Sequence, residues 1–476
     1  MSTRDAHRII ICGGGMAGLC AAVTALQAGA CVTLIEKAPQ LGGTAAMSGG
    51  LIWTFSDFDQ LRRDIPDGDP VLQWLVFDGA DAGRSWLESL GVRLGPEQLM
   101  LGHGRGRAIE PPQAIGTLAD HVRSLGGEVR LATALESLLV VDGAVVGVRA
   151  VSEGRTTDLY GSAVILATGG FQGNPELLTR YGVADPDNLY LRASPWSTGD
   201  GFIAATRAGA AATSGLNTFY GHALAAPPAR FNASELRDVS QYYGPTGVAI
   251  NMQGERFADE SDGTGEEALN QRLARQPRGL GFYIVDQALL DHHPVQGYEI
   301  VTHAILDRAR DHKAPVIVAD TLDDLVEGLG RHGVPRMRAR QEIDQFNLAI
   351  LEGRAEDLRP ARRRNHHALT TPPFHAVGVK ASITFTMGGL AIDEQTRVLR
   401  RAGGSSPLAS VPITRAFQAL GSDHTSIGTE FRMTPIRGLY AAGCDTGNVS
   451  HFGYMGGLCT ALATGRVAGR EAALPA

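Results

Sequence analysis

Two short, uninterrupted runs of apolar residues stand near the start of the chain. Residues 8–12 (RIIIC) form the first run, and residues 31–35 (CVTLI) form the second. Such runs are typical of strands in a parallel sheet that is buried on both faces. Between them, residues 16–28 carry apolar side chains at helical spacing, and Gly29 ends the predicted helix. The pattern therefore predicts a strand–helix–strand unit of about 30 residues, the usual length of a βαβ unit.

The pattern changes twice further along the chain. Residues 163–167 (AVILA) form another run that is typical of a buried strand. From residue 221 to residue 372, charged residues and prolines become more frequent, and amphipathic helices are predicted at 321–329 and 336–351. Apolar runs and glycines then return from Phe374 to the end. We therefore expect one discontinuous domain, residues 1–220 and 373–476, interrupted by a second domain, residues 221–372.

Composition and charge narrow the class of protein. The 476 residues include 43 Lys and Arg against 50 Asp and Glu, a net charge of −7, and 43% are apolar. This balance is ordinary for a globular protein and lacks the basic surface that nucleic acids attract. The five cysteines include no C-x-x-C pair. The uncharged segment between Arg8 and Glu36 is interrupted by glycines, so we expect neither a transmembrane segment nor a signal peptide. The expected location is cytoplasmic.

Two groups of polar residues in the second predicted domain are interpreted as structural. The arginines at positions 359, 362, 363 and 364 are interpreted as the solvated end of a helix. The adjacent histidines at 292–293 and 366–367 lack the spacing of metal ligands. The sequence therefore predicts no metal site.

Glycine is the compositional outlier, with 60 glycines in 476 residues, and its first cluster carries a motif. Residues 13–18 (GGGMAG) fit the pattern G-x-G-x-x-G between the first predicted strand and the helix. In this pattern the first glycine permits a tight turn, the second lets a pyrophosphate approach the backbone, and the third lets helix and strand pack closely. Glu36 ends the second strand, where an acidic residue bonds ribose hydroxyls. The order of these parts predicts a Rossmann-type dinucleotide-binding domain.

A second glycine-rich stretch, residues 42–50 (GGTAAMSGG), favours FAD over a nicotinamide cofactor. It resembles the segment that lies along the pyrophosphate and isoalloxazine in the fumarate reductase/succinate dehydrogenase flavoprotein superfamily, which includes the 3-ketosteroid dehydrogenases and tricarballylate dehydrogenase. Six further stretches resemble motifs of that superfamily in the same order: 167–170 (ATGG), 198–201 (TGDG), 254–260 (GERFADE), 386–393 (TMGGLAID), 438–443 (GLYAAG) and 465–469 (GRVAG).

The resemblance implies a fold and a cofactor. The fold is an α/β, glutathione-reductase-like FAD-binding domain, discontinuous over 1–220 and 373–476, with an inserted α+β cap domain at 221–372 and the active site between them. FAD is expected to bind without a covalent link, because Gly43-Thr44 stands where relatives with linked flavin carry a histidine. Cys444 replaces a glutamate that bonds the ribityl chain in many relatives, and Asp445 is expected to take that part.

The residues expected to bind the cofactor lie mainly in these glycine-rich motifs and at strand ends. They are Gly13, Gly15, Met16, Ala17, Gly18, Glu36, Lys37, Gly43, Thr44, Ser48, Gly49, Gly50, Thr168, Gly169, Asp200, Gly443, Asp445, Gly457 and Leu458.

The chain lacks most groups that the resemblance requires for fumarate reduction. Fumarate reductases surround a dicarboxylate with two arginines and two histidines, and only His222 can be carried over. The general-acid arginine falls at Gly263 or Thr264. The second histidine falls at Thr384 or Phe385, and the arginine that clamps a carboxylate is replaced by Tyr454. Fumarate reduction is therefore not expected.

Tyr454 points toward another branch of the superfamily. Its place before Gly456 and Gly457 resembles the 3-ketosteroid dehydrogenases, in which a tyrosine and backbone amides polarise a keto oxygen. The TMGG and GERFADE segments instead look more like the tricarballylate dehydrogenase branch. The candidate catalytic residues are Tyr454, His222, Tyr243 and Gly457, with Tyr242 and Tyr220 as further candidates for proton transfer.

The expected protein is an FAD-dependent oxidoreductase that acts on a CH–CH or conjugated C=C bond adjacent to a carbonyl. Hydride transfer at flavin N5 requires proton transfer by a protein group at the neighbouring carbon. The alternatives are a tricarballylate-type carboxylic acid dehydrogenase and a flavin-binding redox protein without catalysis. The expected partners are a small-molecule carbonyl substrate and an electron donor or acceptor; the sequence identifies neither that partner nor an oligomeric state.

Overall fold

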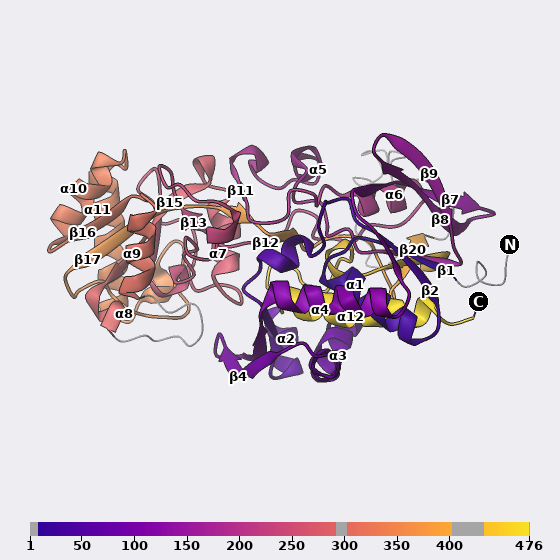
Figure 1. Ribbon diagram of the computed structural model, residues 1–476. Helices are drawn as coiled ribbons and strands as arrows, with labels where there is room; N and C mark the ends of the chain where they lie inside the picture. The colour runs from indigo at the N-terminus through magenta and orange to yellow at the C-terminus, as the bar shows by residue number, and fades with distance from the viewer. Residues whose placement is uncertain (1–7, 292–301, 402–432, 476) are drawn as a thin grey trace, which may run out of the picture.

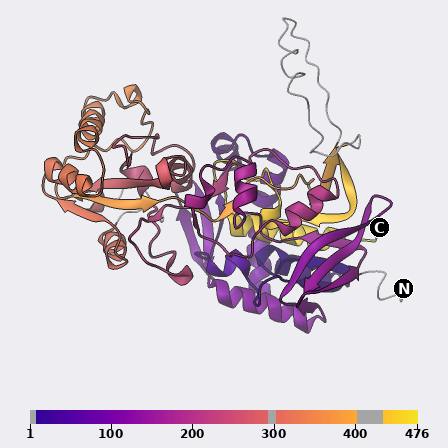
Figure 2. The same ribbon diagram turned by 90° about the horizontal axis from the view of Figure 1, so that it is seen from above.

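The computed structural model describes residues 8–291, 302–401 and 433–475. Its chain forms an elongated molecule with two bodies (Figures 1 and 2). The indigo N-terminal and yellow C-terminal segments share one body, and the salmon segments lie in the other. None of the helices in the described ranges has both the length and the low charge that a bilayer span requires.

A six-stranded sheet forms the centre of the first body, in the order β20-β21-β10-β1-β2-β6. Its neighbours pair in parallel except at the β20 edge. The strands are β1 (Arg8–Cys12), β2 (Cys31–Ile35), β6 (Glu128–Arg130), β10 (Ala163–Leu166), β20 (Arg397–Arg401) and β21 (Met433–Ala441). The expected buried strands and the Rossmann-type α/β class are confirmed.

Helices α1 (Met16–Gln27) and α12 (Gly457–Ala472) pack closely against each other beside this sheet, with α4 (Pro111–Ser124) next to α1. Glycines permit the approach of α12 to α1. A Cβ atom on Gly465 would lie 2.4 Å from the carbonyl oxygen of Ala17, and one on Gly469 would lie 2.3 Å from that of Ala21. The GRVAG segment is therefore a helix–helix contact, which holds the N-terminus of α1 in place.

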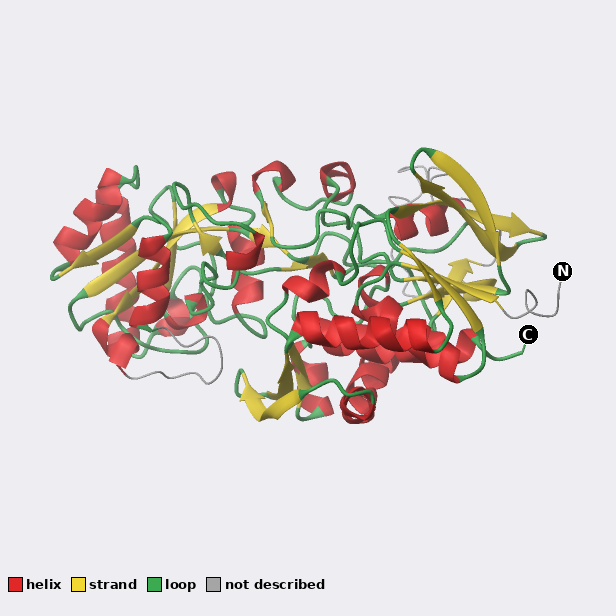
Figure 3. Cartoon of the chain, viewed as in Figure 1, coloured by secondary structure: helices red, strands yellow, loops and turns green. Residues whose placement is uncertain are grey.

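Two smaller sheets complete the first body (Figure 3). The meander β7-β8-β9 comprises β7 (Thr133–Val141), β8 (Ala144–Ser152) and β9 (Arg155–Tyr160). The sheet β3-β5-β4 comprises β3 (Leu51–Phe55), β5 (Gly104–Ile109) and β4 (Leu94–Met100), with α2 (Phe58–Asp64) and α3 (Pro70–Ser89) beside β3.

The second body is built on a five-stranded sheet. Its order is β13 (Leu224–Ala225), β17 (Phe374–Lys380), β15 (Leu280–Asp286) and β14 (Val248–Asn251), and β16 (Val316–Ala319) also pairs with β17. Its helices are α7 (Glu266–Leu273), α8 (Gln287–Asp291), α9 (His303–Asp311), α10 (Leu322–Arg331) and α11 (Arg336–Leu351). The sequence assigned residues 374–380 to the first domain, but β17 pairs with β15 over its full length. The apolar run at 374–380 is buried in this second sheet. The chain therefore leaves the second body only after Lys380.

Arg362 does not have the solvated position that the sequence suggested for the arginine cluster, whereas Arg359, Arg363 and Arg364 are exposed. Arg362 is fully buried and pairs with the buried carboxylate of Glu260 at 2.9 Å. Arg256 of the GERFADE segment pairs with the same carboxylate at 2.7 Å. This ionic cluster fixes the GERFADE segment inside the second body.

Two short strand pairs lie beside the functional site described below. β11 (Tyr190–Leu191) pairs with β18 (Ser382–Ile383), and β12 (Phe219–Tyr220) pairs with β19 (Phe385–Thr386). These pairings bring residues near 192, 220 and 384 together from distant parts of the sequence.

Candidate active site

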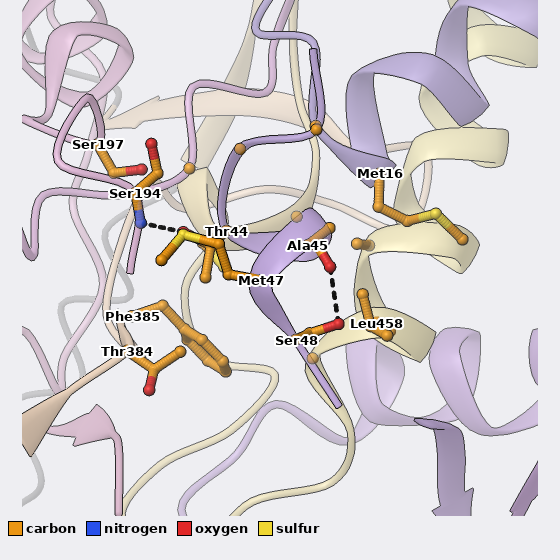
Figure 4. Close-up of a pocket in the computed structure, with 18 of the residues that line it drawn as sticks. Met16, Thr44, Ala45, Met47, Ser48, Ser194, Ser197, Thr384, Phe385 and Leu458 are labelled. Atoms are coloured by element: carbon orange, nitrogen blue, oxygen red, sulfur yellow. Dashed lines mark hydrogen bonds between the residues drawn. The ribbon is translucent and has the colours of Figure 1, made fainter. Parts of the chain in front are cut away.

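A cavity of about 1040 Å³ is lined by residues of both bodies. Ligand cavities of proteins commonly measure about 300–1,000 Å³, so this one can take a large ligand. One part is lined by the glycine-rich loops, and the other contains a group of tyrosines. Figure 4 shows the region where Thr44 and Met47 lie near Ser194, Thr384 and Phe385.

The first glycine motif has the geometry that dinucleotide binding requires. Gly13 has a φ of +111°, and a Cβ atom there would lie 2.1 Å from the carbonyl oxygen of Ala167. Gly15 precedes α1 and provides no side-chain cap, so the first N–H groups of the helix are available to phosphate. Gly18 does not line the cavity; its Cβ would lie 1.9 Å from the carbonyl oxygen of Gly13. Gly18 therefore acts through close packing of helix and strand.

Glu36 is buried at the end of β2 and lines the cavity. One carboxylate oxygen accepts a hydrogen bond from the Gly14 N–H at 2.6 Å, and the other accepts one from the Ala38 N–H at 2.7 Å. Each oxygen keeps a second lone pair for a hydroxyl donor. Lys37 is paired with Asp200 at 3.0 Å, and both residues line the cavity.

The second glycine-rich stretch folds into a short 3₁₀-helix, η2 (Gly43–Met47), against the cavity. The backbone N–H of Ser194 donates to Thr44 Oγ1 at 3.1 Å, and the hydroxyl of Ser48 donates to the Ala45 carbonyl at 2.7 Å (Figure 4). Because glycine carries no side chain, this stretch leaves room for a flat ligand close to the backbone.

The sequence predicts that Asp445 bonds the ribityl chain of FAD, but the structure places this residue away from the cavity. It is buried and is not among the residues that line the cavity. Its carboxylate accepts hydrogen bonds from the backbone N–H and hydroxyl of Thr168, and one from the Gly170 N–H at 3.2 Å. Burial raises the pKa of Asp445 to about 6. The carboxylate thus holds the ATGG turn, and its neighbour Cys444 faces the cavity.

The other predicted cofactor residues all line this one cavity. They are Gly13, Gly15, Met16, Ala17, Glu36, Lys37, Gly43, Thr44, Ser48, Gly49, Gly50, Thr168, Gly169, Asp200, Gly443, Gly457 and Leu458.

Tyr454 lies where the cavity meets the N-terminus of α12. The Gly457 N–H donates to the Tyr454 hydroxyl oxygen at 2.7 Å. The ring of Tyr454 stacks on Tyr220 with centroids 3.9 Å apart, and it contacts Trp53 edge-on. Burial raises the pKa of Tyr454 to about 12, so this side chain is a neutral phenol near pH 7. The sequence predicted that the amides of Gly456 and Gly457 would face a substrate; instead, Gly457 donates to Tyr454, and Gly456 is not among the lining residues.

His222 is buried beside the same tyrosines. Its Nε2 lies 2.8 Å from the hydroxyl oxygen of Tyr220, and its Nδ1 lies 2.7 Å from a carboxylate oxygen of Glu266. Burial, and after it the charge of Arg192, lower the pKa of His222 well below its usual value. Sequence reasoning named His222 and Tyr220 but missed Glu266, which follows the GERFADE segment without any motif of its own.

Arg192 is a second functional candidate that the sequence reasoning missed. Its guanidinium lines the cavity and donates to the hydroxyl oxygens of Thr384 and Tyr242, each at 3.1 Å. Within the described ranges, Arg192 has no carboxylate partner at ion-pair distance. It lies just after a two-residue strand in an irregular segment, so no periodic pattern marks it.

The sequence predicts Tyr243 as a catalytic residue, but this residue does not line the cavity. Its side chain is fully buried in the second body, where its ring meets Tyr283 edge-on, and its hydroxyl has no hydrogen-bond partner among the described residues. Tyr242, its neighbour, lines the cavity instead. The two side chains lie in different surroundings, and only the folded backbone decides which one reaches the cavity.

Over residues 8–291, 302–401 and 433–475, no group of three or more His, Cys, Asp or Glu side chains is arranged to hold a metal ion. His292 and His293 lie outside the described residues.

Comparison with known proteins shows which proteins the chain resembles. Residues 8–407 match the sequence family described as FAD binding domain. The chain is 26% identical to a probable fumarate reductase of Shewanella frigidimarina, over 98% of this chain and 75% of that protein. It is also 26% identical to urocanate reductase of Eggerthella lenta, over 98% of this chain and 74% of that protein.

Two solved structures are similar over nearly the whole chain. The open conformation of a flavocytochrome c3 fumarate reductase has a TM-score of 0.66 and 25% identity, covering 98% of this chain and 78% of that one. The 3-ketosteroid delta1-dehydrogenase from Sterolibacterium denitrificans has a TM-score of 0.69 and 18% identity, covering 98% and 99%. The second likeness shows the fold alone.

Proposed function

The chain belongs to the FAD-binding domain family and is an FAD-dependent oxidoreductase acting on CH–CH or C=C bonds; from this premise, we propose that its bond lies next to a carbonyl group that Tyr454 polarises. Family membership confirms the superfamily and the cofactor expected from the glycine motifs. FAD, when bound, accepts or supplies the hydride. The glycine loops, Glu36 and the N-terminus of α1 would hold it, and we propose that Gly43-Thr44 leaves it without a covalent link.

The proposal depends on the hydrogen bonding of the Tyr454 hydroxyl. Its oxygen accepts the N–H of Gly457 at the start of α12 and is also hydrogen-bonded to Tyr220, and we propose that the Tyr454 proton turns to a bound substrate. A neutral phenol at a helix N-terminus is a strong donor, because the helix dipole favours negative charge on the oxygen. A substrate carbonyl in this cavity would receive that proton as a hydrogen bond while negative charge develops on its oxygen.

Arg192 favours a second candidate function, the oxidation or reduction of a carboxylic acid. A cation in a cavity without a carboxylate partner among the described residues favours an anionic ligand. Arg192 is held by Thr384 and Tyr242, so its guanidinium is already oriented toward the cavity. The two candidates are compatible, because one substrate can carry both a ketone and a carboxylate.

A substrate panel tests the proposal. The FAD-loaded protein is mixed anaerobically with fumarate, urocanate, tricarballylate, 4-androstene-3,17-dione or 4-oxocyclohexanecarboxylate, using a dye acceptor or reduced viologen as the electron partner. Turnover of a ketone supports the role of Tyr454, and turnover restricted to acids supports the second candidate. Electron exchange without turnover of any carbon compound would support a redox protein without catalysis and contradict both.

The first testable prediction concerns Tyr454→Phe. We expect the variant to retain FAD, measured by its absorbance, and to lower kcat on the ketone substrate by about 100-fold or more, the usual scale for such a donor. Arg192→Met is the comparison variant, and we expect it to raise KM mainly for substrates with a carboxylate. Unchanged turnover by Tyr454→Phe would contradict the proposed polarising role.

A further inference from the structure

We propose that Tyr220 exchanges the substrate proton and that His222 and Glu266 form a relay behind it. The inference rests on the proposed function, because it concerns the proton that accompanies hydride transfer. Tyr220 is the catalytic residue in this arrangement, since it faces the cavity. His222 and Glu266 act through it as positioning residues.

The three side chains form a continuous line of hydrogen bonds. The Tyr220 hydroxyl oxygen lies 2.8 Å from His222 Nε2, and His222 Nδ1 lies 2.7 Å from Glu266 Oε2. β12 ends at Tyr220 and His222 lies two residues further on, while Glu266 begins α7. Both His222 and Glu266 are 1% exposed. The line thus runs from the cavity into the interior of the second body.

Glu266 is surrounded by donors, which identifies it as a hydrogen-bond acceptor. The Ala223 N–H donates to it at 3.2 Å, and the Tyr283 hydroxyl donates to it at 2.6 Å. A carboxylate that accepts several hydrogen bonds is stabilised in its ionised form. Its place in the first turn of α7 adds the favourable field of a helix N-terminus.

The partners of His222 determine its tautomer. Its pKa is lowered by burial, so the ring is neutral and carries one proton. The nitrogen beside a carboxylate acceptor, Nδ1, carries that proton. Nε2 then carries the lone pair of the ring and accepts the hydrogen bond of the Tyr220 hydroxyl. This is the arrangement in which a carboxylate orients a histidine toward a hydroxyl group so that the histidine can take its proton.

Tyr220 connects this line to the substrate region. It lines the cavity, and its ring is stacked on Tyr454 and also on Phe385. Tyr454 would hold the carbonyl oxygen of a substrate, and the stacked ring places the Tyr220 hydroxyl close to the same ligand. A proton on the carbon next to that carbonyl is the one made acidic when the carbonyl is polarised.

The proton balance of the step is simple. In the dehydrogenation direction, the C–H bond next to the carbonyl breaks, and its proton goes to the Tyr220 oxygen. The original proton of Tyr220 goes to His222 Nε2, and the resulting imidazolium faces the Glu266 carboxylate. The electron pair of the broken bond becomes the second bond of the C=C, and FAD, when bound, would take the hydride of the neighbouring carbon. Reduction of a C=C bond runs through the same transfers in reverse.

The tautomer of His222 can be measured without any substrate. Long-range ¹⁵N–¹H NMR spectra of the FAD-loaded protein with labelled histidine distinguish the two neutral tautomers, and His222→Gln assigns the signal by its loss. We expect the proton on Nδ1 in the wild-type protein. A proton on Nε2, or on both nitrogens near pH 7, would overturn the relay, because Nε2 would then donate to Tyr220 instead of accepting from it.

The proton transfer itself is tested by exchange at carbon. The wild-type holoenzyme is incubated with 4-oxocyclohexanecarboxylate in ²H₂O without an electron acceptor, and deuterium next to the ketone is followed by NMR. We expect Tyr220→Phe to lower the exchange rate about 100-fold. Glu266→Gln and His222→Gln are expected to lower it about 10-fold or more, with KM in turnover assays unchanged.

Tyr243→Phe is the matched control, because it removes a buried tyrosine hydroxyl of the same body that forms no hydrogen bond in the part of the chain that the structure describes. Its exchange rate should equal that of the wild type. Full exchange in Tyr220→Phe would overturn the proposal and point to Tyr242. If the wild-type protein neither exchanges nor turns over any panel compound, the proposed function fails, and the tautomer measurement still decides whether the relay is present.

Discussion

Burial and hydrogen bonding give the same kinds of side chain different chemical properties in this cavity. Tyr454 is a buried phenol whose oxygen accepts from a helix N-terminus, which suits it to donate a proton. Tyr243 is equally buried, but its hydroxyl has no hydrogen-bond partner within residues 8–291, 302–401 and 433–475, so it contributes packing there. Asp445 lies behind the cavity wall and holds backbone N–H groups there. At the scale of the residue, the surroundings determine function more than the residue type does.

The pH dependence of stability provides a test for Asp445. Its pKa in the folded protein is about 6, above the ordinary value of 3.8. The folded protein therefore binds a proton more readily than the unfolded chain, and stability falls as pH rises through this window. We expect the contribution of Asp445 to the slope of stability against pH to vanish in the Asp445→Asn variant. Melting temperatures measured between pH 4 and pH 7 check it; an identical slope in both proteins would contradict the assignment.

At the scale of elements, the contact between α1 and α12 depends on the absence of side chains. Gly465→Ala would place its Cβ 2.4 Å from the carbonyl oxygen of Ala17, so the helices must move apart. We expect a loss of about 1–3 kcal/mol in the free energy of unfolding, the usual cost of overpacking. Weaker FAD binding should accompany it, because Ala17 lies in the first turn of α1. Urea unfolding and FAD titration measure the two effects.

Gly116→Ala is the matched control for this helix contact. Gly116 lies inside α4, and a Cβ atom there would meet no atom of the described residues within 4 Å. Alanine should therefore stabilise the protein by about 0.5–1 kcal/mol through its better helix propensity. If both substitutions changed the free energy of unfolding in the same direction, close packing would not be the reason for the glycine at 465.

The ionic cluster of the second body leads to another prediction at this scale. Arg362→Met leaves Glu260 buried with Arg256 as its one cationic partner among the described residues. Removing one partner of a buried ion pair costs about 3–5 kcal/mol, and we expect the lower end because Arg256 remains. Circular dichroism during urea unfolding measures the loss. Arg363→Gln, at an exposed position, should leave the curve unchanged.

At the scale of the whole molecule, the two bodies contribute different parts of one cavity. The first body supplies the glycine loops, α1 and α12, which surround the cofactor region. The second supplies His222 and Tyr242, with Glu266 behind them. We therefore expect FAD binding to depend mainly on the first body, and the His222–Glu266 part of the proposed relay to depend on the second. Substitutions in the second body should affect turnover while FAD remains bound.

Removal of FAD tests the stability of the assembled molecule. A ligand that binds only the folded state stabilises it by about 2.7 kcal/mol at a free concentration of about 100 times Kd. We expect the FAD-free protein to melt at a lower temperature and the loss to be recovered when FAD is added. Because non-covalent binding is proposed, mild denaturation followed by gel filtration should release the flavin. Flavin that stays with the denatured chain would contradict non-covalent binding.

The sequence by itself determined the cofactor region because that region is local in the chain. A tight turn at Gly13, the packing of Gly18 and the acid at Glu36 are each required by nearby backbone geometry, so their order in the sequence carries the information. The central strands are likewise predicted from short apolar runs. Even there, the function of Asp445 was misjudged, since its side chain turns away from the cavity toward the ATGG turn.

Only the tertiary structure decided the chemical part of the site. Arg192, Tyr220 and Glu266 come together through the pairings of β11 with β18 and of β12 with β19 and through the position of α7. The choice between Tyr242 and Tyr243 depends on the path of an irregular segment. These arrangements are set by contacts between residues far apart in the chain, and no local pattern records them. The sequence therefore determines that the protein holds a flavin, and the folded structure determines which side chains meet its substrate.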